Sequence, residues 1–433
     1  MKKTLLIITC ALICASVHAQ TRYVGGDISM LTKYEQHNSP YKDAYGKNIS
    51  DMLTWFMQEC KWNTFRVRIF VNPGTSDPSV CQDLAYVTAL GQRIKAAGGY
   101  FMLDFHYSDT WVDASHIQAP AAWKGASDAA MADSVAAYTR RVLTALNAVD
   151  ATPDFVQVGN EIMYGLCDRK VHPYDASGDN WTGYLALLHA GCDAVRECCP
   201  NAQIIIHTDR PNEVTNTKYY YNRLINDGVD FDIIGLSYYP FWHGYLNTTS
   251  VNLVSSINAY AAEFPAKRVH IVECAYNFQY WPSSGVKYDT QSIWPCSKKG
   301  QYNFVKDLVD ALLPLENVDG LSYWFPEEAG NGDDTNWSTS NGTVLTGWLN
   351  RGFWDENAST TGHAINRTGQ ITGDLTAADV CAPYYMGKFR GEEQGIGFVI
   401  TEPVIQTNKT IRDGLILIER NGVLYTPDGK RLL

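Results

Sequence analysis

The chain has 433 residues, of which 45% are hydrophobic and 19% charged, so it is long and apolar enough for one large folded domain with a small appendage. Its net charge of −11, with no basic run to offset it, excludes charge-driven binding to nucleic acid or to an anionic membrane surface. An aromatic content of 12% instead suits a neutral partner whose apolar faces can stack on rings.

The first nineteen residues are typical of a signal peptide. Lys2 and Lys3 form a basic start, residues 5–17 are the apolar core, and Ala19 ends a small-residue cleavage site. The apolar run is too short to span a membrane, and a lipid anchor on Cys14 would follow bulky residues. We therefore expect export and cleavage after Ala19, which removes two lysines and no acids and changes the net charge to −13.

Nine of the eleven cysteines remain after this cleavage, an odd number for an exported chain. At least one cysteine is then unpaired or pairs with another molecule. Cys192, Cys198 and Cys199 lie close together, but they lack the two separated pairs of a structural zinc site. We interpret them as buried thiols or one disulfide at a helix end, and we predict no bound metal.

Eight short β-rich runs alternate with amphipathic helical stretches along the mature chain. The runs cover residues 23–29, 65–71, 100–106, 154–160, 203–207, 231–238, 268–273 and 320–324. Apolar residues at helical spacing mark stretches such as 83–97, 128–147, 181–198 and 301–313. Eight strand–helix units predict an α/β fold, a (β/α)8 TIM barrel within residues 20–391. A doubly wound open sheet is the alternative, but no glycine fingerprint follows the first run.

The last part of the chain differs from this pattern. Residues 329–354 form a long loop rich in Gly, Asn and Asp, which should overhang the barrel face where the strands end. Residues 392–433 form a small tail with an expected hairpin at Asn421-Gly422. The tail is too small for a core of its own, so we predict a domain boundary near residue 392.

Two glutamates close runs that are far apart in the sequence. In a parallel barrel the C-terminal ends of all strands meet at one face, where active sites are built. Glu161 closes the fourth run behind Asn160, and Glu273 closes the seventh. A single Glu at a strand end is more often a helix cap or a solvated charge. Two of them, with an Asn that can bind a sugar 2-OH, favour the paired carboxyl groups that cleave a glycosidic bond.

Two arginines alternate on the second run and should share the face toward the barrel interior. A buried arginine needs a carboxylate partner, because an isolated buried charge is too costly. We expect Arg66 to form a structural salt bridge with Asp27 or Asp104. Arg68 lies nearer the strand end, and we expect it to pair with Glu273 and keep that group ionised.

A lone histidine, His106, is the last residue of the third run. Its side chain could orient a carboxylate or bind a sugar hydroxyl, but such a residue is more often a satisfied core histidine.

Six motifs stand at the expected strand ends. They are Gly26-Asp-Ile-Ser, Phe65-Arg-Val-Arg, Leu103-Asp-Phe-His-Tyr-Ser-Asp-Thr-Trp, Val156-Gln-Val-Gly-Asn-Glu, Ile234-Gly-Leu-Ser-Tyr-Tyr-Pro-Phe-Trp-His-Gly and Ile271-Val-Glu. Together, from about residue 23 to residue 353, they resemble the arabinogalactan endo-β-1,4-galactanases of glycoside hydrolase family fifty-three. The third and fifth motifs are long and specific, whereas Asn-Glu alone is shared by the whole clan A of retaining barrels.

The resemblance implies roles for individual residues. It makes Glu161 the acid/base and Glu273 the nucleophile of a retaining mechanism. The positions matching those around the nucleophile and the cleaved sugar are Arg68, His106, Tyr239 and Trp324. The positions expected to line the groove are Trp111, His207, Tyr238 and Trp242. Asp109 and Asn160 complete the expected substrate-binding set, and which of the two tyrosines contacts the nucleophile stays open.

The chain also departs from the family pattern. Some bacterial members bind calcium through acids in the loop after the seventh strand, but here residues 276–300 contain only Asp289 among acids. Asp333-Asp334 in the next loop is more typical of a solvated turn, so we predict no calcium and no cofactor. Trp324-Phe-Pro-Glu-Glu replaces the Trp-Glu-Pro of many relatives, so the far end of the groove should differ. The tail resembles C-terminal segments of exported bacterial proteins, which implies sorting or anchoring.

We therefore predict an exported, monomeric, endo-acting β-1,4-galactanase whose partner is a polysaccharide, pectic galactan, cleaved with retention. Another clan A enzyme, such as a mannanase, xylanase or endoglucanase, is the first alternative, because the sequence does not show how the groove meets the sugar 4-OH. A glycan-binding barrel without turnover is the second, although two intact glutamates argue against it. The expected location is periplasmic, cell-surface or extracellular.

Overall fold

The chain forms two units, residues 1–391 and 392–433, and each is described by itself. The computed structural model describes residues 21–36, 40–77, 79–244, 246, 252–279, 293–328, 350–355, 362–391, 407–412, 415–420 and 423–425. Several predicted features lie outside the described residues. They are the signal peptide, Asp289, residues 329–349 of the predicted long loop with Asp333-Asp334, and the hairpin turn at Asn421-Gly422.

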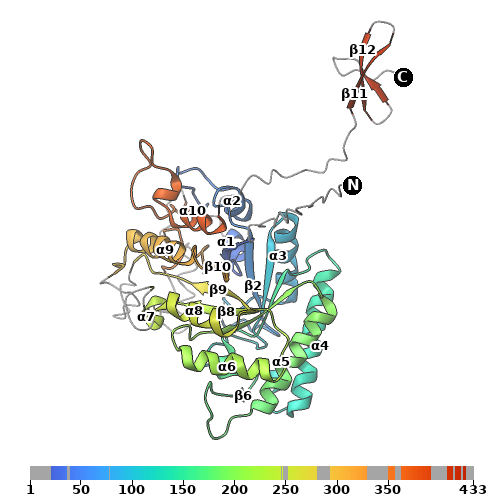
Figure 1. Ribbon diagram of the computed structural model, residues 1–433, viewed down its shortest axis with the longest axis vertical. Coiled ribbons are helices and arrows are strands. Elements are labelled where there is room, and N and C mark those ends of the chain that lie inside the picture. Colours follow the sequence, from blue (N-terminus) through green and yellow to red (C-terminus); the bar gives the residue numbers. More distant parts are fainter. Residues whose placement is uncertain are drawn as a thin grey trace, which may run out of the picture. The chain divides into compact units, whose positions relative to one another are not determined.

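The first unit is a closed barrel of eight parallel strands in the order β1-β10-β9-β8-β7-β4-β3-β2, with helices around it (Figure 1). The strands are β1 (Tyr23–Asp27), β2 (Thr64–Ile69), β3 (Tyr100–Phe105), β4 (Phe155–Val158), β7 (Gln203–Thr208), β8 (Ile233–Tyr238), β9 (Arg268–Cys274) and β10 (Val318–Trp324). All eight predicted runs are barrel strands, so the predicted TIM barrel is confirmed. The sequence did not predict a short antiparallel pair, β5 (Gly165–Leu166) and β6 (Arg169–Lys170).

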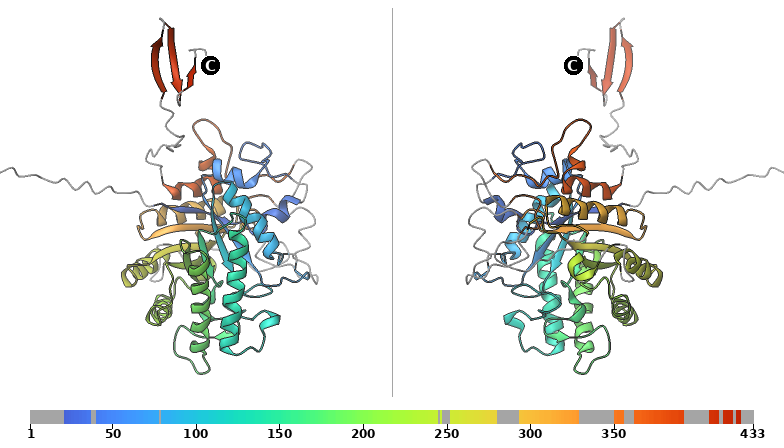
Figure 2. Two further views of the ribbon diagram at one scale, coloured as in Figure 1. Left: turned by 90° about the vertical axis from the view of Figure 1, so that its right-hand side faces the viewer. Right: turned by 90° about the vertical axis from the view of Figure 1, so that its left-hand side faces the viewer.

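Helices follow most strands and cover the outside of the barrel. Their bounds are α1 (Leu31–Gln36), α2 (Met52–Gln58), α3 (Leu84–Ala96), α4 (Asp128–Asn147), α5 (Trp181–Cys198), α6 (Val214–Asn226), α7 (Pro240–His243), α8 (Leu253–Glu263), α9 (Lys298–Leu312) and α10 (Ala382–Met386). The side chains of Ser127 and Asn180 accept hydrogen bonds at the starts of α4 and α5, as N-caps do. These two long helices lie side by side in both views (Figure 2). No helix in the described part of the chain is both long and apolar enough to cross a membrane.

Alternation along the strands divides the barrel into an outer and an inner face. On β3, Phe101 and Leu103 pack into the large core, whereas Met102 belongs to a separate inner apolar layer. The other members of this inner layer are Phe155, Ile205, Ile233 and Val272. Further along the same face of β3 come Asp104 and His106, both buried. The barrel interior is therefore mainly apolar toward the strand N-termini, where His270 and Asp319 form a buried pair, and polar toward the C-terminal ends.

One irregularity decides how β9 presents its side chains. The register pairs Leu236 of β8 with Ile271, and then Ser237 with Glu273, so Val272 is an extra residue. Such a β-bulge lets two consecutive residues face the same side. Val272 lies in the inner apolar layer and Glu273 lines the cavity described below. Without the bulge, plain alternation would turn Glu273 toward the helices.

The second unit contains a three-stranded antiparallel sheet. Its strands are β11 (Thr407–Arg412), β12 (Leu415–Arg420) and β13 (Val423–Tyr425), in that order. The antiparallel pairing of β12 with β13 agrees with the predicted hairpin. A role of this unit in sorting or anchoring stays a prediction.

Candidate active site

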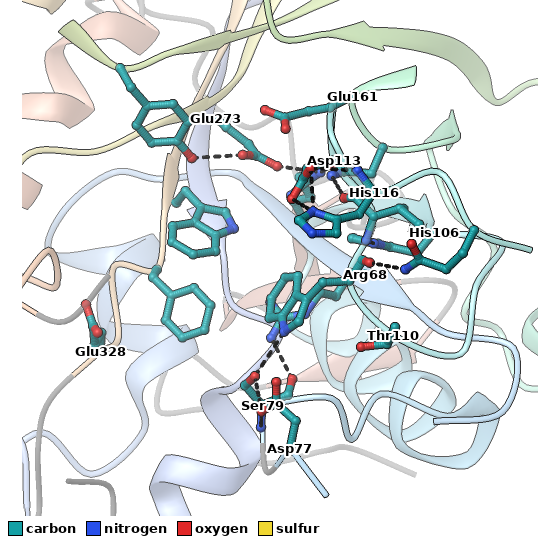
Figure 3. Close-up of a pocket in the computed structure, with 18 residues that line it drawn as sticks. Arg68, Asp77, Ser79, His106, Thr110, Asp113, His116, Glu161, Glu273 and Glu328 are labelled. Atoms are coloured by element: carbon teal, nitrogen blue, oxygen red, sulfur yellow. Dashed lines mark hydrogen bonds and ion pairs between the residues drawn. The ribbon is translucent and has the colours of Figure 1, made fainter. Parts of the chain in front are cut away.

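A cavity of about 460 Å³ lies at the C-terminal ends of the barrel strands. This volume is in the range of small-molecule binding sites. Glu161 and Glu273 lie at one end of it and Asp77 and Ser79 at the other (Figure 3). The structure thus brings together the two glutamates that the sequence singled out, although 112 positions separate them in the chain.

Glu273 is held by two donors. The Arg66 guanidinium lies 2.9 Å from its Oε1, and the Tyr239 hydroxyl donates to its Oε2 at 2.8 Å. Burial of the carboxyl group, which is only 6% exposed, raises its pKa to about 7. Arg66 and Tyr239 act in the opposite direction and lower that pKa, because both stabilise the ionised form.

Arg66, and not Arg68, is the arginine that contacts Glu273. Arg66 forms the expected salt bridges, at 2.7 Å to Asp27 and 2.8 Å to Asp104, and it also binds Glu273. The prediction that Arg68 pairs with Glu273 is wrong. Arg66 lies one interior position deeper, where its side chain reaches acids on both sides, whereas Arg68 contacts Asp27 at 3.3 Å.

Arg68 still lines the cavity, but beneath an aromatic ring. Its guanidinium lies 4.3 Å from the ring centre of Trp111, and it donates to the Ser79 carbonyl at 3.1 Å. The indole of Trp111 donates to the Ser79 hydroxyl and meets the Trp324 ring at an angle of 67°. Trp111 and Trp324 thus line the cavity with apolar rings of the kind that a sugar packs against.

Glu161 sits on a tight turn directly after β4. Gly159 has φ 92° and Glu161 has φ 49°, a left-handed conformation that is costly for a non-glycine residue. The Glu161 backbone N–H donates to Nδ1 of His207 at 3.3 Å, and the Ser237 hydroxyl donates to the Glu161 Oε1 at 2.5 Å. The turn and these two contacts direct the carboxyl group into the cavity.

The two carboxyl groups differ in how strongly they retain a proton. Burial raises the pKa of Glu161 well above its ordinary range, and the carboxylates of Glu273 and Asp209 raise it further. The Ser237 hydroxyl lowers it. Among the described residues, no arginine offsets the burial of Glu161 as Arg66 does at Glu273, so Glu161 keeps its proton to higher pH. A protonated acid beside an ionised carboxylate is the arrangement that acid-assisted nucleophilic substitution requires.

Asn160 and His106 line the cavity as predicted. The Asn160 carbonyl oxygen accepts from Arg66 at 2.8 Å, and its amide donates to the Val112 carbonyl at 2.8 Å. His106 accepts from the Val112 backbone N–H at Nδ1 and directs Nε2 toward Asp104 at 3.2 Å. These hydrogen bonds therefore fix the orientation of both side chains, so that each presents the same polar edge to a ligand.

Tyr239, and not Tyr238, contacts Glu273, the predicted nucleophile, which answers the choice that the sequence left open. Alternation on β8 turns Tyr238 outward, where its ring stacks on Phe304 and its hydroxyl donates to the Gly244 carbonyl. The prediction that Tyr238 lines the groove is therefore wrong, because its side chain is fully buried in the outer core.

Three further residues predicted to bind substrate lie beside the cavity and are not among its described lining residues. His207 is buried behind Glu161, between Gln157 and Ser237. Asp109 accepts from the Ala121 backbone N–H and so fixes the loop after β3. Trp242 lies on α7 with its ring edge-on to Tyr239, and 43% of its surface is exposed.

Sequence reasoning missed several polar groups of the site. Ser237 touches Glu161, and Gln157 lies between Arg66, Asp104 and His207. Asp113 and His116, paired at 2.9 Å on the loop after β3, also line the cavity. A polar residue at an inward position of an otherwise apolar strand, as in Val156-Gln-Val, is the signal that could have found Gln157.

The described residues contain no group of three or more His, Cys, Asp or Glu side chains arranged to hold a metal ion. Cys192 and Cys199 are buried and Cys198 is half-buried, and each is a free thiol. Of the two interpretations of this cluster, the structure has the buried thiols and not the disulfide.

Comparison with known proteins identifies the family. The sequence profile of Glycosyl hydrolase family 53 matches residues 23–365, most of the chain. This chain belongs to glycosyl hydrolase family 53. It is a glycoside hydrolase, as the sequence predicted, and the match covers every barrel strand.

Family 53 relatives align along most of their own length. A probable arabinogalactan endo-β-1,4-galactanase A of Aspergillus terreus is 33% identical over 71% of this chain and 86% of that protein. The arabinogalactan endo-β-1,4-galactanase of Cellvibrio japonicus is 30% identical over 82% of this chain and 93% of that protein. The solved family 53 catalytic domain of Ignisphaera aggregans superposes with a TM-score of 0.69 at 27% identity, covering 81% of this chain and 95% of that domain.

Proposed function

We propose that this protein is a secreted endo-β-1,4-galactanase that cleaves the galactan of pectic arabinogalactan with retention of anomeric configuration. The observation on which the mechanism rests is the unequal environment of the two carboxyl groups in one cavity. Glu273 is bound by Arg66 and Tyr239, whereas Glu161 is bound by Ser237 and faces other carboxylates. The names of the aligned relatives support galactan as the substrate.

In the first step an ionised Glu273 oxygen attacks the anomeric carbon as the glycosidic C–O bond breaks. Glu161 gives its proton to the departing oxygen, and a glycosyl ester on Glu273 remains. In the second step the Glu161 carboxylate takes a proton from a water whose oxygen attacks the same carbon and releases Glu273. Arg66 and Tyr239 stabilise Glu273 in its charged forms, before the attack and after release.

The cavity wall supports binding of a chain rather than of a single sugar. Trp111 and Trp324 extend the lining from the carboxyl groups toward Ser79, so neighbouring sugar rings can stack on them. Binding within a chain gives internal cuts, which is endo action. Export rests on the predicted signal peptide of residues 1–19.

An assay on four polysaccharides tests the substrate and the stereochemistry together. On linear β-1,4-galactan we expect a rapid fall in viscosity, short β-configured oligosaccharides in early NMR spectra and little free galactose. Mannan, xylan and carboxymethylcellulose should give few new reducing ends. Good cleavage of mannan without cleavage of galactan would exclude the proposed substrate, an α-configured first product would exclude retention, and binding without any cleavage would leave a glycan-binding barrel.

Azide rescue tests the two roles separately. Glu161→Ala should lose activity on galactan but keep activity on an aryl β-galactooligosaccharide with a good leaving group, which needs little protonation. Added azide should then give a β-galactosyl azide, since azide replaces water on the glycosyl-enzyme. The matched variant Glu273→Ala should give the α-azide instead. The opposite pair of products would mean that the two roles are exchanged.

A further inference from the structure

A chain of hydrogen bonds ends on the carboxyl group of Glu161, and it begins at Gln157. The carbonyl oxygen of Gln157 accepts from Arg66 Nε at 3.3 Å, and its amide nitrogen donates to Asp104 Oδ1 at 2.6 Å. These two contacts fix the orientation of the amide. The same NH2 group lies 3.1 Å from Nδ1 of His207, so it is a donor to that nitrogen.

The tautomer of His207 follows from its neighbours. Nδ1 faces two donors, the Gln157 amide and the Glu161 backbone N–H, so it must be the acceptor nitrogen. Burial, together with the positive charge of Arg66, lowers the pKa of His207 well below its ordinary value, so the ring stays neutral. Its one proton is therefore on Nε2, which lies 2.8 Å from Ser237 Oγ.

The direction of the hydrogen bond between Ser237 and Glu161 is then fixed as well. Ser237 Oγ accepts from His207 and has one proton to give, and Glu161 Oε1 lies 2.5 Å away. Among the described residues, Oε1 is the acceptor within reach of that proton. A proton on Oε1 would leave the buried Ser237 O–H without this acceptor, which costs free energy. The favourable arrangement places the exchangeable proton of Glu161 on Oε2.

We propose that Ser237, oriented by His207, is the positioning residue of the acid/base: it occupies Oε1 as a permanent donor, so that Oε2 delivers and recovers the catalytic proton. The inference rests on the role of Glu161 proposed above and adds which of its oxygens reacts. The same contact serves both steps, because a Ser237 donor stabilises the Glu161 carboxylate that forms when the leaving group departs.

The charged groups around Glu161 make this donor important. Glu273 on β9, Asp209 after β7 and Asp113 on the loop after β3 all disfavour an ionised Glu161. Ser237 on β8 opposes them, while His207 on β7 is neutral. Without the Ser237 hydroxyl, the Glu161 carboxylate that forms as the leaving group departs would lose its hydrogen-bond donor at Oε1.

Ser237→Ala tests the proposal by its pH profile. The alkaline limb of kcat/KM on galactan should move to higher pH, because Glu161 then keeps its proton longer. At the pH optimum the rate should fall by about tenfold to a hundredfold, the usual effect of losing a hydrogen bond to a charged group. The initial burst on an aryl substrate with a good leaving group should stay within about twofold of wild type, since that step needs no proton.

Three further variants separate this effect from damage to the barrel. Ser237→Thr keeps the hydroxyl and should restore the wild-type alkaline limb, and Ser237→Cys should show a smaller shift in the same direction. Thr208→Val removes a neighbouring buried hydroxyl that contacts Tyr221, and it should leave the limb in place. Melting temperatures verify that each variant folds. If Ser237→Ala does not fold, the pH profiles of Ser237→Cys and Ser237→Thr test the proposal.

An unchanged alkaline limb with equal losses on both substrates would overturn the positioning role and leave Ser237 a structural residue. A shift of the same size in Thr208→Val would do so too. Failure of the proposed function is seen elsewhere, in the anomer of the azide product from Glu161→Ala, so the two failures are distinguishable.

Discussion

After Arg66, Tyr239 is the group that most strongly favours the ionised form of Glu273, the proposed nucleophile. The tyrosine hydroxyl is buried, and burial together with the charge of Glu273 raises the pKa of Tyr239 well above its ordinary value. The hydroxyl therefore keeps its proton over the whole working range of pH. It is a permanent donor to Glu273, as Ser237 is to Glu161.

Tyr239→Phe should lower kcat/KM by about tenfold to a hundredfold, because a hydrogen bond to a charged group is lost. Tyr239 lowers the pKa of Glu273, so its removal raises that pKa. Activity needs ionised Glu273 and is lost as the pH falls through this pKa, so the acid limb should move to higher pH. The measurement is the pH profile of kcat/KM on galactan.

The adjacent tyrosine provides the control. Tyr238→Phe removes a hydroxyl that donates to the Gly244 carbonyl from the outer face of β8. It should leave the acid limb where it is in the wild type. If both variants move the limb equally, the effect comes from packing of β8 and not from the contact with Glu273.

At the scale of single residues, the sequence predicted which residues line the cavity better than it predicted which of them contact one another. Glu161, Glu273 and Asn160 were found because strand ends meet at one barrel face. The partner of Glu273 was assigned to Arg68 and not Arg66, because the depth of a side chain in the barrel depends on the register between strands. The orientation of Glu273 also depends on the extra residue Val272, which no alternation of apolar neighbours reveals.

Among the elements, the turn after β4 couples backbone strain to the position of the acid. A Cβ on Gly159 would lie 2.5 Å from Cγ2 of Ile162, and the residue has φ 92°. Two residues later Glu161 is itself left-handed. A change in this turn is therefore expected to move the carboxyl group that Ser237 and the backbone contact to His207 hold.

Gly159→Ala should destabilise the protein by about 1–3 kcal/mol and also reduce kcat/KM, since strain and a steric clash displace Glu161. Urea unfolding and galactan kinetics measure the two effects. Gly178→Ala is the matched control: Gly178 has φ 90°, but a Cβ there meets nothing within 4 Å. Gly178→Ala should lower the free energy of unfolding but keep the wild-type kcat/KM. An equal loss of kcat/KM in both variants would contradict the role of this turn.

The elements themselves were predictable to different degrees. All eight barrel strands were found because each is a buried apolar run, and α4 and α5 were found with their bounds because capped amphipathic helices of this length have a clear period. The pair β5 and β6 was not found, since two residues per strand leave no pattern to detect.

At the scale of the whole molecule, the described residues of the site all belong to the first unit. The described residues that line the cavity lie between Arg66 and Glu328, well before residue 391. A chain that stops after Gly391 should therefore keep the melting temperature and the kcat/KM of the full chain. Circular dichroism and the galactan assay check this. Failure of the truncated chain to fold would mean that residues 392–433 stabilise the barrel.

Chelation tests the prediction that no metal supports the fold. Acids are scarce in the loop after β9, and the described residues contain no cluster of metal ligands. EDTA should change neither the melting temperature nor the rate, and EDTA preloaded with calcium is the control. A drop of several degrees that calcium reverses would reveal a site that the sequence did not suggest.

Because of the bulge at Val272, the direction of the Glu273 side chain depends on the register between β8 and β9. A substitution at position 272 can alter packing, but only a change in the number of residues can move Glu273 from the cavity to the helix layer, because each deletion reverses every side chain beyond it. Val272 is a surplus residue relative to the ladder with β8. We therefore expect a chimera of two parallel barrels to keep Glu273 in the cavity when β8 and β9 come from the same parent, because the register between these two strands then stays intact.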